Sequence, residues 1–536
     1  MRVFLTSVDW LVAIITLTGS LGAGLYIAHL AKAGKTSANF FLGGRKITWP
    51  IVGASLFATN IGAEHLVGLS GDAYRYGLSA GAVELTTAIT LGFGCAVLFP
   101  YYIKNQIFTI PEFLEMRYNR NARLFFSALM LVISIMTKMA FTLYAGALVL
   151  NSILGFDVMT TVILIGIVTS LFTIIGGFTA VAYTDTIQAV LMIAGCSLMF
   201  LIGINEVGGW DALLKKVPEA MHVAKPYDDP VYPFWGILAT AFYAGIFYWG
   251  IDQVNVQRVL AAPNINQARW GAMFATLLKL FPIFIFAMPG VIALALYPGL
   301  DESSSKQTFV ILLNNLLPSG IRGLVLASLL AALISSLIAV LNSVSTMTVR
   351  DFIVEFRPGT SERSQVFLGR LVILAATLLG ISATYLIYSS SEGLYKYLQT
   401  ITAYLVFPVI PAIIFGIISK RITLKAAYYS IVAGILLATL FVTDQLIGIE
   451  KGKQWFPYLH FDLTYNFGYR GLWGTLLIMI VLFSVSAFTA KTEPAKLEKT
   501  TINWSKKFDP LKGIKDWRIQ WIVLAVVTVL IYAWLW

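Results

Sequence analysis

The chain has 536 residues, of which 58% are hydrophobic and only 12% are charged, and its formal net charge is +11. A water-soluble domain carries about a quarter charged residues, so this composition, with a mean hydropathy of +0.79, indicates a membrane protein. Two cysteines and four scattered histidines argue against a disulfide framework or a zinc site. Basic cytoplasmic loops explain the positive charge without a nucleic-acid partner.

Apolar runs long enough to cross a bilayer recur along the chain. A spanning helix needs about 20 mainly apolar residues, because the hydrocarbon core is roughly 30 Å thick. The first run follows one basic residue, Arg2, and is too long for the apolar core of a signal peptide, so we interpret it as a retained helix. We expect an all-α polytopic membrane protein with about 14 transmembrane helices. The expected helices span residues 10–31, 51–68, 78–103, 125–151, 159–175, 180–204, 232–254, 270–297, 320–349, 367–388, 394–418, 426–442, 471–488 and 517–536.

The loops between these helices differ in charge. If the N-terminus lies outside, most Lys and Arg residues fall in inward loops, at residues 32–46, 104–123, 420–425 and 491–515. Basic residues accumulate on the cytoplasmic side of membrane proteins. We therefore expect a multi-pass protein of the inner or plasma membrane, embedded in the lipid bilayer, with both termini extracellular or periplasmic.

Small and polar residues interrupt two of the expected spans. The second carries Asn60, Gly62 and His65 in its middle, and the seventh carries Gly250 and Asp252. Every backbone group in lipid must be paired within the protein, so an interrupted helix is typical of a transporter binding site. The two spans each open a stretch of five helices, which favours a five-plus-five inverted repeat. We divide the chain into an extra N-terminal helix with an inward loop (1–50), a first repeat (51–204), an extracellular loop (205–231), a second repeat (232–418) and three C-terminal helices (419–536).

Among the ionisable residues within expected spans we single out Glu84, Asp185 and Lys279. An ionisable group at mid-bilayer costs about 2.5–3.5 kcal/mol on insertion scales, so each of them needs a partner or a function. Glu84 and Lys279 either contact a transported solute or form a structural ion pair with each other.

Other side chains suit a sugar-like ligand. Sugar hydroxyls need donors and acceptors, which Asn60, His65 and Gln399 supply beside the two charged residues. The apolar face of a sugar ring needs an aromatic partner, and Tyr248 and Trp249 are candidates. Ordinary helix packing is the alternative role for these two rings.

A sodium ion needs several hard oxygen ligands, which neutral hydroxyls and unwound carbonyls provide. Ser335 and Ser336 are adjacent hydroxyl residues in a helix rich in alanine. The alternative is that these small residues only let helices approach closely. The serine pair alone does not decide between the two.

Five segments resemble the sodium:solute symporter family, and they occur in the family's order. They are GASLFATNIGAEHLVGLSG (53–71), GGFTAVAYTDTIQ (176–188), YWGIDQVNVQRVLAA (248–262), RGLVLASLLAALISSLIAVLNSVSTM (322–347) and YLQTITAYL (397–405). Within the family, the resemblance is closest to the sodium/glucose (galactose) cotransporters. It covers nearly the whole chain.

The resemblance implies the leucine-transporter-like fold, with ten core helices, one helix before them and three after. It implies a sodium site made by the carbonyls of Ala58, Ile61 and Ala332 and the hydroxyls of Ser335 and Ser336, and a second sodium position at Asp185. It implies substrate contacts from Asn60, His65, Glu84, Thr87, Tyr248, Trp249, Lys279 and Gln399, and gates at Leu69, Tyr248 and Tyr395. Gly245 and Lys396 depart from the usual pattern of the sugar carriers.

The expected function is sodium-coupled symport of a small neutral solute, a hexose such as glucose or galactose, by alternating access. Na⁺ is the expected coupling ion. Alternatives are a sodium symporter for myo-inositol, an amino acid or an organic acid, or a transport-dead sugar sensor. No complete phosphate-binding loop, zinc-protease motif or nucleophile triad is present in the sequence, so we expect no enzyme.

Overall fold

The computed structural model describes residues 5–32, 34–62, 64–301, 307–388, 404–451, 467–503 and 513–536. Within this part of the chain every regular element is a helix, and a single isolated bridge joins Lys225 to Pro233. The helices are α1 (Ser7–Leu30), α2 (Ser37–Leu42), α3 (Trp49–Asn60), α4 (Leu69–Tyr76), α5 (Ala82–Leu85), α6 (Thr87–Phe93), α7 (Phe99–Lys104), α8 (Ile110–Arg117), α9 (Arg120–Val132), α10 (Ala140–Leu154), α11 (Val158–Val207), α12 (Trp210–Lys216), α13 (Phe234–Thr240), α14 (Ile246–Gly250), α15 (Gln253–Leu260), α16 (Ile265–Leu278), α17 (Met288–Leu296), α19 (Thr308–Asn315), α20 (Ile321–Met347), α21 (Val354–Phe356), α22 (Glu362–Tyr388), α24 (Ile410–Ile418), α25 (Leu424–Lys451), α26 (Phe467–Phe488), α27 (Pro494–Thr500) and α28 (Trp517–Trp534).

Among the described residues, ten helical stretches are long and apolar enough to cross a membrane. A further bent pair, α13–α14 with α15, meets at 55° and raises this number to up to 11. The expected helix at 394–418 begins outside the described residues, which contain its last part as α24. The count of about 14 therefore stays a prediction, whereas the all-helical polytopic fold is confirmed.

Both spans that the sequence marked as interrupted are broken in the structure. The first breaks after α3, where Ile61 has an extended backbone, and the chain resumes as a π-helical turn (Glu64–Gly68) that leads into α4. The second breaks between α14 and α15, where Asp252 caps α15 by accepting from the Val254 amide at 3.2 Å. The breaks leave backbone groups of both spans free for other partners.

The sequence predicted separate helices at 159–175 and 180–204, but the structure joins them as α11. The chain kinks inside α11 at Gly177, whose φ of 56° and ψ of −164° are accessible only to glycine. A Cβ there would also lie 2.9 Å from the Phe40 ring. The expected connecting loop is thus reduced to one residue.

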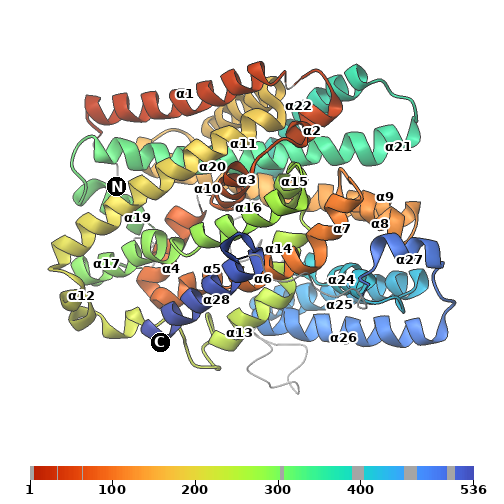
Figure 1. Cartoon of the computed structure of the whole chain (residues 1–536). Coiled ribbons are helices and arrows are strands. Elements are labelled where there is room, and N and C mark those ends of the chain that lie inside the picture. The colour runs from red at the N-terminus through yellow and green to blue at the C-terminus, as the bar shows by residue number, and fades with distance from the viewer. Residues whose placement is uncertain are drawn as a thin grey trace.

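The helices form a single bundle (Figure 1), and burial places α20 inside it and α1 and α28 on its outside. The most apolar window of α20 is 83% buried, against 22% for α1 and 11% for α28. Val523, Val526 and Val529 of α28 are more than half exposed, as expected for side chains that face lipid. The two labelled chain ends lie on the left of Figure 1, and α8, α9 and α27 lie on the right.

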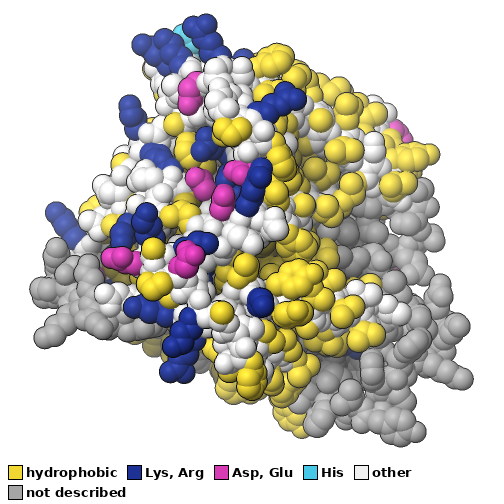
Figure 2. All heavy atoms as spheres, turned by 90° about the vertical axis from the view of Figure 1, so that its right-hand side faces the viewer, with side chains coloured by type: hydrophobic (Ala, Val, Ile, Leu, Met, Phe, Trp, Pro, Cys, Tyr) yellow, Lys and Arg dark blue, Asp and Glu magenta, His cyan; other side chains and the backbone are white. Residues whose placement is uncertain are grey.

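Charged side chains gather at the end of the bundle that holds α8, α9 and α27. Figure 2 shows this face, where dark blue Lys and Arg side chains lie among white atoms and a broad yellow apolar surface lies beside them. This is the distribution of a protein whose flank faces lipid and whose end faces water.

Candidate functional site

A buried ion pair joins the third and eighth of the expected spans. Glu84 lies in α5 and is 7% exposed, and Lys279 directly follows α16 and is 2% exposed. The Lys279 ammonium donates to Oε2 of Glu84. The structure thus forms the ion pair that the sequence analysis gave as one of two possibilities. The attraction between the two charges offsets part of the cost of taking them out of water.

His65 completes this cluster from the π-helical turn after α3. Its Nε2 lies 3.4 Å from Oε1 of Glu84, while its Nδ1 accepts a 3.3 Å hydrogen bond from the Gly62 amide. Because Nδ1 accepts, the neutral ring carries its proton on Nε2 and directs it at Glu84. The break in the first span therefore fixes the tautomer of a residue that contacts the carboxylate.

Aromatic rings lie against the same charges. The Lys279 ammonium is 5.7 Å from the centroid of the Trp249 ring, which is 5% exposed. The ring centroids of Tyr248 and Trp249 are 5.3 Å apart, and the two rings are edge to face. An apolar ring beside a pair of opposite charges is the composition expected of a small-molecule site.

Asn60, the last residue of α3, carries an unsatisfied acceptor. Its Oδ1 is buried and accepts no hydrogen bond in the structure. A buried polar atom without a partner costs about 1–3 kcal/mol. A ligand hydroxyl that donates to Oδ1 would remove this cost.

The remaining predicted substrate and gate residues are placed as follows. Thr87 begins α6, three residues after Glu84, and is buried. Leu69 begins α4 and is partly buried where the two main hydrophobic clusters meet. Gln399 and Tyr395 lie outside the described residues, as does Lys396.

A second ion pair, which the sequence reasoning missed, lies beside Tyr248. Lys138 forms a hydrogen-bonded ion pair with Oδ2 of Asp252, at the break between α14 and α15. Its ammonium lies 5.5 Å from the centroid of the Tyr248 ring, and the Asn255 amide donates to the Tyr248 carbonyl at 3.0 Å. Lys138 is an ionisable residue inside an expected span, so the argument that selected Glu84 would have found it.

The end of α3 faces α20 through hydroxyl and carbonyl oxygens. The Ser336 hydroxyl donates to the carbonyl of Ile61 at 3.2 Å and also lies 3.4 Å from that of Thr59. Ala58, Ile61 and Ala332 are fully buried. Carbonyls at the C-terminal end of a broken helix carry the negative end of the helix dipole and suit a monovalent cation.

Ser335 faces a different group, the carboxylate of Asp185. Oδ1 of Asp185 accepts from Ser335 at 2.6 Å, and Oδ2 accepts from Ser55 at 2.6 Å and from Thr59 at 3.2 Å. Arg258 approaches the same Oδ2 at 3.4 Å. The two predicted cation positions are adjacent, because Ser336 faces one of them and Ser335 faces the other. The sequence analysis did not predict the contacts of Arg258, Ser55 and Thr59 with Asp185.

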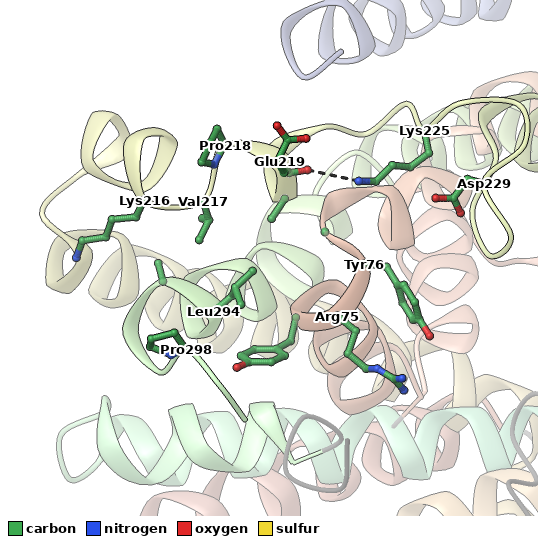
Figure 3. A pocket seen from close by; sticks show the side chains of 14 residues that line it. Arg75, Tyr76, Lys216, Val217, Pro218, Glu219, Lys225, Asp229, Leu294 and Pro298 are labelled. Carbon is green, nitrogen blue, oxygen red and sulfur yellow. Dashed lines mark hydrogen bonds between the residues drawn. The ribbon is translucent and has the colours of Figure 1, made fainter. Parts of the chain in front are cut away.

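A separate cavity lies at the end of the molecule that holds the two termini. It measures about 700 Å³ and is lined by the end of α4, the end of α17 and the segment after α12. Figure 3 shows Arg75 and Tyr76 on one side of it and Glu219 and Lys225 on the other. None of the predicted substrate residues lines this cavity.

Fold and site together define a multi-pass membrane transporter built around two broken helices. Within the described residues, no group of three or more His, Cys, Asp and Glu side chains could hold a metal ion. The hydroxyl and carbonyl oxygens that α3 and α20 contribute are neutral, which suits a transported monovalent cation better than a resident divalent metal.

Comparison with known proteins gives the family. Residues 40–434 match the model of the sodium:solute symporter family, and the chain belongs to that family. It is 32% identical to the sodium/myo-inositol cotransporter of Homo sapiens over 530 residues, which cover 88% of this chain and 72% of that protein. It is also 32% identical to sodium/glucose cotransporter 1 of Ovis aries over 543 residues, which cover 93% of this chain and 80% of that protein.

Solved structures show the same fold. A Na⁺-coupled sialic acid symporter in a substrate-bound, outward-open state superposes with a TM-score of 0.76 at 22% identity, over 91% of this chain and 99% of that one. Mhp1, of the nucleobase-cation-symport-1 family, superposes with a TM-score of 0.55 at 14% identity, over 85% of this chain and 97% of the Mhp1 chain. The expected leucine-transporter-like fold is confirmed, and the protein is a sodium-coupled symporter and not an enzyme.

Proposed function

We propose that the transported solute is a hexose, glucose or galactose, and that it binds at the cluster of Glu84, Lys279, His65 and Trp249. The observation that carries this proposal is the ion pair itself, buried beside an aromatic ring and contacted by His65. A carboxylate accepts from sugar hydroxyls and an ammonium donates to them. We place Thr87, Tyr248 and Gln399 at the same site and Leu69 and Tyr395 at its entrance.

The charge balance of the cluster favours a neutral solute. Glu84 and Lys279 neutralise each other, and His65 is neutral in the tautomer that its contacts require. An organic acid would have to compete with Glu84 for Lys279 and leave the carboxylate unpaired. Leaving one partner of a buried pair uncompensated costs about 3–5 kcal/mol.

We propose that sodium binds where α3 ends against α20. The ion would take the carbonyls of Ala58, Ile61 and Ala332 and the hydroxyls of Ser335 and Ser336. In the structure the Ser336 hydroxyl donates to the Ile61 carbonyl and the Ser335 hydroxyl donates to Asp185. Both hydroxyls would therefore turn their lone pairs towards the ion when sodium binds, and Ser335 would release Asp185. The ion would then hold the α3 break in shape, which orients Asn60 and His65 for the solute.

Asp185 is the proposed second sodium position. Its carboxylate already contacts three hydroxyls, but it also contacts Arg258. A sodium ion there would have to displace the guanidinium or share the carboxylate with it. The sodium dependence of uptake tests this, because a Hill coefficient of one excludes a second cooperative ion.

The driving force suffices for accumulation. One sodium ion that crosses 100 mV releases about 2.3 kcal/mol, and a tenfold sodium gradient adds about 1.4 kcal/mol. Their sum of about 3.7 kcal/mol supports a several-hundred-fold gradient of a neutral solute.

The test is uptake of radiolabelled glucose and galactose into proteoliposomes with an inward sodium gradient, with potassium as the matched control. Sodium-dependent accumulation that Gln399→Ala abolishes supports the hexose and its site. Absence of uptake of both sugars, with sodium-dependent uptake of another solute, refutes the hexose assignment and leaves the symporter class intact.

Myo-inositol is the second candidate, because several of the most similar relatives are sodium/myo-inositol cotransporters. It is also a neutral ring polyol, so the same cluster suits it. Unlabelled myo-inositol that competes with labelled hexose more strongly than glucose does would favour it.

We further propose that both termini are extracellular or periplasmic and that residues 51–204 and 232–418 form the two inverted repeats. The basic end of the molecule in Figure 2 would then face the cytoplasm. Impermeant labelling of a cysteine added after Trp536 in intact cells tests the orientation, and labelling only after lysis would refute it.

A further inference from the structure

We propose that α28 positions the substrate site by holding the backbone of α5 and α6 through two hydrogen bonds, so that Tyr532 and Trp521 are positioning residues for Glu84. This inference rests on the proposed function, because it assigns a role to a helix outside the proposed repeats in forming that site. In Figure 1 α28 passes in front of α5 and α6, and it packs against α6.

The first hydrogen bond lies where the helix around Glu84 is irregular. The Thr86 amide donates to the Val83 carbonyl at 3.1 Å, three residues back, whereas a regular α-helix would have it donate to Ala82. The Tyr532 hydroxyl donates to that Ala82 carbonyl at 2.8 Å. The terminal helix therefore supplies a donor to the carbonyl that the irregular turn released, two residues before Glu84.

The second hydrogen bond lies on the other side of Glu84. Nε1 of Trp521 donates to the Ala88 carbonyl at 2.8 Å. The indole fits against α6 because residue 92 is glycine, where a Cβ would lie 2.1 Å from Nε1. Two side chains of α28 thus fix the backbone before and after the irregular turn.

The start of α28 also holds the helix that leads to the partner of Glu84. Trp270 of α16 donates its Nε1 proton to the Lys515 carbonyl at 2.8 Å. The Arg269 guanidinium lies 4.8 Å from the centroid of the Trp517 ring. Since Lys279 directly follows α16, α28 and the residues before it contact the segments that carry both members of the ion pair.

Packing alone does not require these contacts. The lipid-facing side of α28 is apolar, and apolar side chains would also suffice to pack it against the bundle. Instead, two polar groups of α28 donate to backbone carbonyls on the segment that carries Glu84. Such contacts fix the position of a side chain more narrowly than apolar contacts do, because hydrogen bonds are directional.

The test uses Tyr532→Phe and Trp521→Phe in the full chain, which remove one donor each and keep a ring. Affinity for solute and for sodium is measured separately by titration of purified protein, with glucose, galactose and myo-inositol as probes. Each variant is expected to weaken solute binding roughly 3- to 10-fold, the range that loss of one hydrogen bond spans. The apparent sodium affinity should stay unchanged, because the proposed sodium ligands lie on α3 and α20.

Two further variants separate positioning from a general loss of structure. Gly92→Ala should displace Trp521 and reproduce the phenotype of its substitution. Tyr26→Phe is the matched control, since Tyr26 is 65% exposed. When Glu84 is already replaced by Gln, Tyr532→Phe should lower solute affinity little further. Both changes act on the contact between the solute and residue 84.

The outcomes distinguish this inference from the proposed function. Wild-type protein that binds none of the three probes refutes the proposed function and this role together. Wild-type binding with unaffected α28 variants refutes the positioning role alone. If the α28 variants lose solute affinity, sodium affinity and thermal stability to the same degree, and if these losses add to those of Glu84→Gln, α28 is merely structural. That result also refutes the positioning role.

Discussion

Replacing Glu84 with Gln tests the candidate site most directly, because it removes one charge and keeps the shape. Lys279 is 2% exposed and would lose its carboxylate partner. Breaking a buried pair from one side costs about 3–5 kcal/mol of stability. A solute hydroxyl that donated to the carboxylate would lose a charge-assisted hydrogen bond worth about 1.5–3 kcal/mol. We therefore expect solute affinity to fall roughly 10- to 100-fold.

The assay is solute titration together with thermal unfolding of purified protein at saturating sodium. A double variant, Glu84→Gln with Lys279→Met, removes both charges and should recover much of the lost stability without recovering binding. Glu206→Gln, at an exposed position, is the matched control. If Glu84→Gln bound glucose, galactose and myo-inositol as wild type does, the ion pair would be structural and our site would be wrong.

Three other substitutions have defined outcomes. Ser336→Ala should raise the sodium concentration for half-maximal uptake roughly tenfold, about 1.4 kcal/mol, since it removes one proposed ligand. Asp252→Asn should lower both thermal stability, by about 2 kcal/mol, and the maximal uptake rate, because Lys138 keeps a partly buried charge beside the Tyr248 ring. Gly290→Ala should cost about 1–3 kcal/mol of thermal stability, because its Cβ would lie 2.1 Å from the Ser70 carbonyl oxygen.

Each of these substitutions has a control and a contradicting result. Ser382→Ala removes an exposed hydroxyl and should leave sodium activation unchanged, and wild-type sodium activation of Ser336→Ala would refute the sodium site. Lys138→Met should partly restore the stability lost in Asp252→Asn, and an additive loss would contradict the pairing. Gly22→Ala, with open space around its Cβ, should be neutral, and a neutral Gly290→Ala would show that α4 and α17 can separate freely.

Much of the fold could be read from the sequence, because hydropathy and helix length are local properties. The apolar runs predicted the membrane class, and glycine and polar residues marked both broken spans. Glu84, Lys279 and Asp185 stood out because ionisable side chains in apolar runs need an explanation. The sequence reasoning missed short helices such as α8, α12 and α19, and in α11 a single glycine provides the kink that the sequence led us to expect as a loop.

Tertiary structure alone decided which of these residues meet. Glu84 and Lys279 are 195 positions apart, and only the packing of α5 against the end of α16 brings them together. The same holds for the contact of Arg258 with Asp185 and for the hydrogen bonds from α28 to the segment around Glu84. A sequence pattern records that a buried charge or a released carbonyl needs a partner, but the choice of partner depends on how distant helices pack, and that is a property of the whole bundle.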